Sequence, residues 1–196
     1  MILRGWYLRR AIPWVALLGC CAAALLLGVA LAQWPTSALV LLPGVVASCA
    51  AAAAFCFDEV SLPVVEVTPR GATWRRTARL AAAAVPLGVW TLFVVVGSRD
   101  VPLDRSGWWV VGGAAIVLTL GVAALASRHA VASPGGSLAS FVVLVVISPV
   151  VLLAFLGWDS LYPIGEFGAG VLTFWIAVAA TGVLAALTAL RPGVGA

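Results

Sequence analysis

The sequence contains neither lysine nor asparagine, and only 9% of its 196 residues are charged. Soluble domains average about 25% charged residues, so a water-soluble globular fold is excluded. The phosphate-binding loop G-x-x-x-x-G-K-S/T requires a lysine, and this nucleotide site is therefore excluded as well. We expect no cofactor in this chain, and any ATP that acts on it must be bound by a partner.

Side chains that commonly perform catalysis or bind metals are also scarce. The only histidine, His129, lies in the polar stretch SRHAVASPGGS, where a solvated loop residue is expected. The four cysteines show no C-x-x-C spacing, so we interpret them as small packing residues. No acidic residue lies deep in an apolar block, which leaves the proton relay of many secondary transporters without a carrier. These absences predict a protein that is not an enzyme and that binds no metal.

Long apolar runs dominate what the sequence does contain, since 64% of its residues are hydrophobic. A helix needs about 20 apolar residues to cross roughly 30 Å of hydrocarbon. Six blocks reach this length, and none has a charge near its middle. We therefore predict a single domain over residues 1–196, an all-α integral membrane bundle of six transmembrane helices. These helices are expected at about 11–32, 38–57, 77–98, 107–126, 138–157 and 169–190.

The distribution of arginines predicts the orientation of the helices. With the amino terminus in the cytoplasm, nine arginines and three acids lie on the cytoplasmic side, against two arginines and four acids outside. Cytoplasmic loops of membrane proteins carry an excess of basic residues, so we expect both termini in the cytoplasm. The cytoplasmic arginines are then Arg4, Arg9, Arg10, Arg70, Arg75, Arg76, Arg79, Arg128 and Arg191.

One link between predicted helices concentrates the charge of the chain. Residues 58–79 hold seven of the eighteen charged residues, and 58–76 is the longest cytoplasmic link. Arginine and tryptophan are typical of the membrane interface, which accounts for the basic half of this stretch. The preceding acid–apolar–acid segment is more typical of a surface that contacts protein. The residues expected to anchor the chain at the membrane interface are Trp6, Trp74, Arg9 and Arg10.

The stretch FCFDEVSLPVVEVTPRGATWRRTARL resembles the cytoplasmic link between the second and third helices of small six-helix ABC-2-type transporter permeases from actinobacteria. In that family an acidic pair leaves the second helix, a Thr-Pro or Ser-Pro follows, and paired arginines open the third helix. MILRGWYLRR, residues 1–10, is similar to an interfacial elbow helix before the first span. GWDSLYPIGEFGAG occupies the place of a short outer re-entrant segment, assigned to residues 158–168.

The resemblance implies the non-catalytic permease subunit of an ATP-driven exporter in the bacterial cytoplasmic membrane. A separate ATPase subunit would engage the 58–76 link, and ATP would bind only to that partner. A second permease copy or paralogue and the lipid bilayer are the other expected partners, whereas nucleic acid is not. The residues nominated for the ATPase contact are Asp58, Glu59, Glu66, Arg70, Arg75 and Arg76.

Two alternatives fit the same composition. The chain could be a non-transporting membrane protein, such as an assembly factor, an immunity protein or a complex subunit, with the charged link as its docking face. It could also be an ATP-independent carrier or channel in which hydroxyl side chains line a weakly polar path. The sequence leaves the transported substrate open under either transport hypothesis.

Small residues recur at intervals of four in several apolar blocks, and such stripes let helices approach closely. Six helices are too few to enclose a transport path alone. We therefore predict that the stripe containing Gly28 or the stripe containing Thr181 forms a seam with a second permease subunit.

Overall fold

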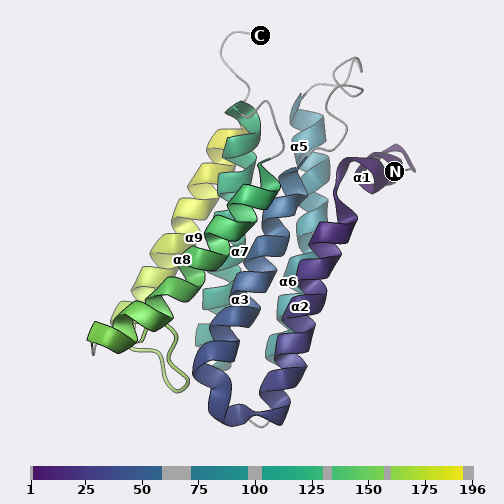
Figure 1. Ribbon diagram of the computed structural model, residues 1–196. Coiled ribbons are helices and arrows are strands. Elements are labelled where there is room, and N and C mark those ends of the chain that lie inside the picture. Colours follow the sequence, from purple (N-terminus) through teal and green to yellow (C-terminus); the bar gives the residue numbers. More distant parts are fainter. Residues whose placement is uncertain (1, 59–71, 97–102, 130–133, 157–159, 192–196) are drawn as a thin grey trace.

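The computed structural model describes residues 2–58, 72–96, 103–129, 134–156 and 160–191 (Figure 1). Helices are the only regular secondary structure in these ranges, and six spans are long and apolar enough to cross a membrane. The predicted all-α fold with six such spans is therefore confirmed, whereas the orientation of the termini stays a prediction. The helices are α1 (Ile2–Ala11), α2 (Trp14–Gln33), α3 (Ala38–Ala54), α5 (Ala72–Leu80), α6 (Ala84–Val96), α7 (Arg105–His129), α8 (Gly135–Leu156) and α9 (Ala169–Leu190), with short 3₁₀ turns η1 (Pro35–Ser37), η2 (Phe55–Phe57) and η3 (Ala81–Ala83).

A proline separates the short first helix from the first long one. α1 ends at Ala11, and Pro13 has no backbone N–H with which to continue it. Trp14 closes this corner by donating its indole N–H to the carbonyl of Leu8 at 3.0 Å. Residues 2–11 thus form a separate helix at an angle to α2 (Figure 1), close to the range expected for the elbow.

The third candidate span covers Thr77–Val96, so its predicted start at residue 77 is confirmed, although the helix itself begins earlier, at Ala72, and is not uniform. α5 passes through the 3₁₀ turn η3 into α6, which contains Pro86. A proline ring clashes with the carbonyl four residues earlier in a regular α-helix, and here that residue is Ala82 in η3. The change of helix type is therefore a local consequence of Pro86.

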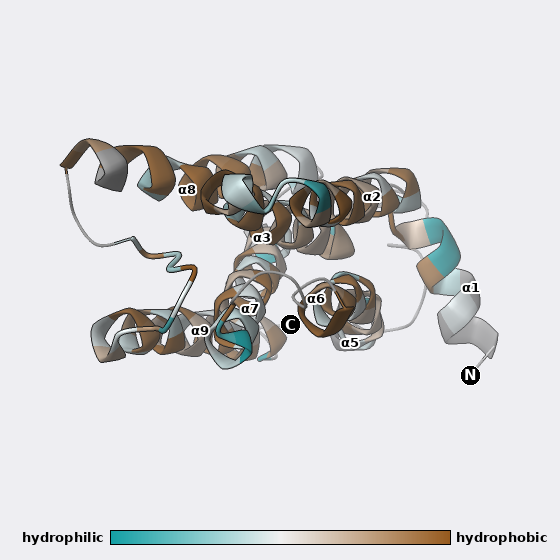
Figure 2. Cartoon of the chain, turned by 90° about the horizontal axis from the view of Figure 1, so that it is seen from below, coloured by the Kyte–Doolittle hydropathy of each residue, from teal (hydrophilic) through white to brown (hydrophobic). Residues whose placement is uncertain are grey.

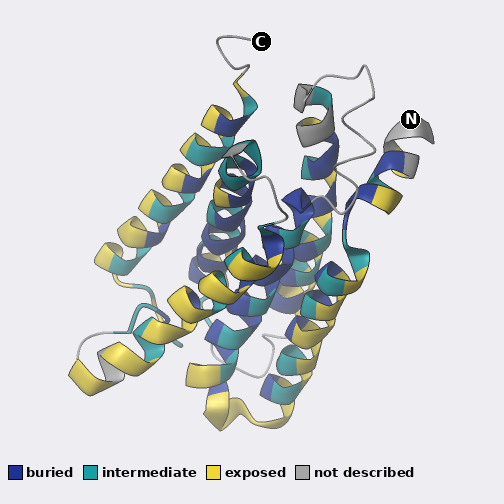
Figure 3. Cartoon of the chain, turned by 45° about the horizontal axis from the view of Figure 1, so that its top comes forward, coloured by how far each residue is buried: buried dark blue, intermediate teal, exposed yellow. Residues whose placement is uncertain are grey.

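The bundle consists of two layers of three long helices. Seen along the helices, α8, α3 and α2 form one layer and α9, α7 and α6 form the other (Figure 2). The central helices α3 and α7 pack against each other and against most of the remaining helices. Burial follows this arrangement (Figure 3). In an apolar stretch of 18 residues, 67% are buried in the α3 span, compared with 11% in α9. The outer faces of α2, α8 and α9 are therefore the surfaces left for lipid or partners.

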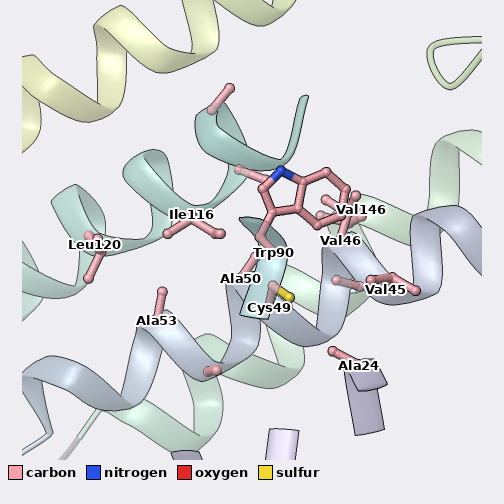
Figure 4. Close-up of a cluster of buried hydrophobic side chains, with 14 of the residues drawn as sticks. Ala24, Val45, Val46, Cys49, Ala50, Ala53, Trp90, Ile116, Leu120 and Val146 are labelled. Atoms are coloured by element: carbon pink, nitrogen blue, oxygen red, sulfur yellow. The ribbon is translucent and has the colours of Figure 1, made fainter. Parts of the chain in front are cut away.

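Trp90 of α6 fills the centre of the bundle. Its side chain is fully buried and lies near Val46 of α3 and Ile116 of α7 (Figure 4). A side chain at Gly112 of α7 would overlap the Trp90 ring, so only glycine allows the two helices to approach this closely. One large aromatic side chain thus packs at the place where the two layers meet.

Glycines also set the contact between α7 and α9. A Cβ atom added to Gly182 of α9 would lie 2.5 Å from the backbone of Leu118, and one added to Gly121 of α7 would strike the Gly182 carbonyl. Two helix backbones meet this closely only where side chains are absent. The two small-residue stripes predicted to form a subunit seam differ in their surroundings. A Cβ added to Gly28 would meet Phe93 of the same chain at 3.1 Å, whereas Thr181 is exposed on α9.

The segment between α8 and α9 turns back against the bundle over its described part, residues 160–168. Tyr162 is buried and donates its hydroxyl to the carbonyl of Val146 in α8 at 2.9 Å. Trp175 of α9 donates its indole N–H to the carbonyl of Leu161 at 3.0 Å. The segment thereby ties α8 to α9 at the end where Figure 2 shows these helices standing apart.

Candidate functional site

The charged link predicted as the functional site leaves the bundle after α3 and returns to it at α5 (Figure 1). Residues 59–71 fall outside the described residues, and the predicted contacts of Glu59, Glu66 and Arg70 fall there too. Arg75 and Arg76 lie on α5, but their side chains are likewise outside the description. What the structure describes is how the two ends of the link are held.

Five residues hold these ends, and we call them the anchor cluster. They come from α1, from the end of the α3 span and from α5, which meet at one end of the bundle. The members are Tyr7, Phe57, Asp58, Trp74 and Arg79.

Arg79 is the centre of the anchor cluster. It lies on α5 and is only 3% exposed, although an arginine is among the residues least often buried. Its Nε donates to the hydroxyl of Tyr7 and its Nη1 donates to the carbonyl of Phe57, each at 3.0 Å. The guanidinium carbon also lies 5.8 Å from the centroid of the Tyr7 ring, within the range of a cation–π contact. One side chain therefore joins α1, η2 and α5.

Asp58 makes the second connection. Its carboxylate is 7% exposed and accepts a hydrogen bond from the backbone N–H of Gly135, the first residue of α8, at 3.3 Å. A negative charge at the amino terminus of a helix is stabilised by the helix dipole and by the free N–H groups there. A Cβ atom on Gly135 would lie 2.6 Å from the Asp58 carboxylate, so glycine leaves the space that this contact needs. The structure gives Asp58 a partner inside the chain, and its contact with an ATPase stays a prediction.

An aromatic pair covers the outer side of the anchor cluster. The rings of Tyr7 and Trp74 lie 5.4 Å apart between centroids, and Ala11 and Ala78 are buried beside them. Trp74 is half-buried against α1, so at least part of its surface contacts protein as well as any lipid.

The remaining predicted anchors lie on α1. The side chains of Arg9 and Arg10 are exposed there, while the side chain of Trp6 lies outside the description. Their contact with a membrane interface stays a prediction.

From the sequence alone, Arg79 is expected only as one of the cytoplasmic arginines, and Tyr7 carries no expectation. Two separate features of the sequence could have indicated them. Arg79 lies inside the third apolar block, near its start, and Tyr7 is the only tyrosine in the first 161 residues. Their pairing across 72 positions of sequence was not encoded in any local pattern.

The contacts of the anchor cluster include hydrogen bonds, a cation–π contact and aromatic packing. Among the described residues no group of three or more histidine, cysteine or acidic side chains is placed to hold a metal ion. The cysteines lie in the first two long helices and in η2, as free thiols. The anchor cluster therefore fixes the ends of the link against the helices. Its five residues bring no nucleophile or acid–base pair together.

Comparison with known proteins adds no assignment. No protein-family model matches the chain, and searches of the curated proteins and of the solved structures return no match.

Proposed function

We propose that the chain is the non-catalytic, membrane-spanning permease subunit of an ATP-driven exporter, with both termini in the cytoplasm of a bacterial cell. A separate ATPase subunit binds the 58–76 link, and a second permease copy or paralogue completes the transport path. The proposal starts from the likeness of the link sequence to ABC-2-type permeases.

The observation that supports it best is the way the link is anchored. On one side, Asp58 binds the start of α8. On the other, Arg79 binds Tyr7 of α1 and Phe57 at the end of the α3 span. A force applied to the link by a partner therefore reaches α1, η2, α5 and α8 together. A link that served only as a topological marker needs no such buried polar contacts, which require desolvation of two charges.

The proposed mechanism is mechanical. ATP binding closes the two ATPase subunits, and their movement displaces the link and the helices anchored to it. α8 is the helix best placed to respond, because it is mostly exposed and is held at its first residue by Asp58. Interactions that differ between the two states of the bundle must supply the driving force.

Reversal of one link charge tests the proposal. Glu66→Arg should leave membrane insertion intact, because the residue lies in the cytoplasmic link rather than in a span. Loss of a charge buried at a contact typically costs about 2–5 kcal/mol, so co-purification of the ATPase should fall at least tenfold. The tagged chain would be purified from membranes of its native host, and the eluate assayed for an ATPase subunit and for ATP hydrolysis.

Glu166→Arg is the matched control, because it makes the same change at an exposed residue in the segment 160–168. It should leave ATPase recovery unchanged. Equal recovery with the Glu66 and Glu166 variants, or a wild-type chain that never retains an ATPase, would contradict the proposal.

A further inference from the structure

An apolar cavity of about 210 Å³ lies between α7, α8 and α9. α7 contributes Val122 to its wall, α8 contributes Leu138 and Phe141, and α9 contributes Val178. All of these residues lie within helices long and apolar enough to cross a membrane. The cavity is therefore at membrane depth, beside the most exposed helices of the bundle.

The polar groups of the wall are already bound within the protein. Thr119 donates its hydroxyl to the carbonyl of Ala115 at 2.8 Å, and the Tyr162 hydroxyl donates to Val146. The Trp175 indole N–H donates to Leu161. An occupant thus finds no free hydrogen-bonding side chain on the described wall, which selects for hydrocarbon over water or a polar solute. Apolar cavities of about 150 Å³ stay dry and bind small hydrocarbons, and this one is larger.

The cavity is open on one side, and Phe141 on its wall is 62% exposed. It can therefore be entered from the hydrocarbon of a bilayer around the spans, and an acyl chain is the apolar ligand that a bilayer supplies at the highest concentration.

Positive charge lies beyond one end of the cavity. Arg128 is the last residue of the α7 span and lies less than two helical turns beyond Val122. Its Nη1 donates a hydrogen bond of 2.6 Å to the carbonyl of Thr188, near the end of α9. Arg191 follows α9 and is exposed. The described carboxylate at this end of the bundle, that of Asp58, is buried against α8. The charge at this end therefore complements a phosphate group.

We propose that the cavity binds one acyl chain of a membrane phospholipid, whose phosphate lies at Arg128 and Arg191. The site extends beyond the proposed function and does not depend on it, because it requires neither an ATPase nor transport. The bound lipid fills the space between α8 and α9 and supports the packing of these two peripheral helices.

Photocrosslinking from two phenylalanines on α8 tests the site. Both are exposed, Phe141 by 62% and Phe155 by 87%, but only Phe141 lines the cavity. Each would be replaced in turn by benzoylphenylalanine, and the protein purified from membranes and diluted into lipid-free detergent before irradiation. Intact-mass spectrometry should then find a phospholipid adduct at position 141 and at least fivefold less at position 155. Equal adduct at the two positions would overturn the proposal, and a cross-linked dimer from position 141 would identify a second copy as the occupant instead.

Filling the cavity provides the second test. Val178→Trp places a large ring in the cavity, and Val183→Trp makes the same change on α9 at a residue that is 46% exposed and outside the cavity. With benzoylphenylalanine at position 141, the adduct should be lost in the Val178 variant and retained in the Val183 variant. Retention in both variants would overturn the proposal even if both proteins fold normally.

The headgroup part of the site is tested at the arginines. Arg128→Gln should lower the retained phospholipid at least threefold, because the phosphate loses a cation. Arg105→Gln removes an exposed arginine from the opposite end of α7 and should leave retention unchanged. An unchanged adduct with the Arg128 variant would contradict the phosphate assignment.

Discussion

Asp58 and Arg79 are the buried charged side chains of the described chain; Asp58 accepts a hydrogen bond from the Gly135 backbone, and Arg79 donates to the Tyr7 hydroxyl and to the Phe57 carbonyl. Hydrogen bonds to charged groups contribute about 1.5–3 kcal/mol each, whereas a buried charge without partners is strongly unfavourable. These contacts are therefore needed for the two residues to be buried at all. Asp58 and Arg79 also lie at the two ends of the link. The contacts that stabilise the fold there are therefore the ones that would transmit a movement of the link to the helices.

The first residue-scale prediction concerns two adjacent glycines at the start of α8. Gly135→Ala should destabilise the protein by about 1–3 kcal/mol, because the new methyl group would lie 2.6 Å from the Asp58 carboxylate and displace it. Gly136→Ala meets no atom within 4 Å and should stabilise it by about 0.4–1 kcal/mol, through a less flexible unfolded chain. The apparent melting temperature in detergent measures both changes. Shifts of the same sign would show that Asp58 does not hold α8 as described.

At the scale of helices, glycine residues allow helices and aromatic rings to approach closely. Gly112 receives the ring of Trp90, Gly107 receives the ring of Phe167, and Gly182 lets α9 touch the backbone of α7. In a membrane, apolar side chains gain little by leaving lipid, so close packing is a main source of helix association. α9 is bound to the bundle mainly through α7, and its stability should depend on that one crossing.

Two alanine substitutions on α9 test this dependence. Gly182→Ala should separate α9 from α7 and lower stability by about 1–3 kcal/mol, because the added Cβ would lie 2.5 Å from the backbone of Leu118. Gly170→Ala, at the start of α9, meets no atom within 4 Å and should be neutral or slightly stabilising. Thermal denaturation in detergent, followed by size-exclusion chromatography, compares the two. A Gly182 variant as stable as the Gly170 variant would contradict the close crossing.

At the scale of the whole molecule, burial is uneven in a way that a soluble bundle would not tolerate. The centre of the bundle is closed by α3 and α7, while much of α8 and α9 is exposed (Figure 3), and large apolar residues are among those exposed. Phe141, Leu144, Phe155 and Leu184 are each more than half exposed. A bilayer removes the cost of this exposure, and a second subunit could cover the same faces.

The orientation of the bundle is the whole-molecule prediction. A cysteine at Ser106, exposed at the start of α7, should react with an impermeant maleimide added outside intact cells. A cysteine at Gly71, in the link, should react only after the membrane is opened. Most of the natural cysteines are buried, which keeps the background low. The opposite labelling pattern would place the link outside the cell and remove the basis for an ATPase contact.

The number, type and approximate limits of the long helices could be predicted from the sequence, because the cause is local. A segment that crosses hydrocarbon must satisfy its own backbone hydrogen bonds and must be about 20 apolar residues long, so length and composition suffice. The span predicted at 169–190 coincides with α9, and the span predicted at 138–157 lies within three residues of α8 at each end. The third span starts at Thr77, as predicted, while its helix begins earlier, at Ala72, because the arginines and the threonine there do not prevent a helix outside the hydrocarbon.

Only the tertiary structure decided which helices pair and what the charged residues bind. Arg79 reaches Tyr7 across 72 positions and Asp58 reaches Gly135 across 77, and no short pattern encodes contacts at such distances. The cavity between α7, α8 and α9 likewise depends on the paths of three helices, because it is formed by the space that their side chains leave unfilled. Local sequence sets the length of each helix through the thickness of the membrane, whereas packing between distant segments sets where each side chain lies.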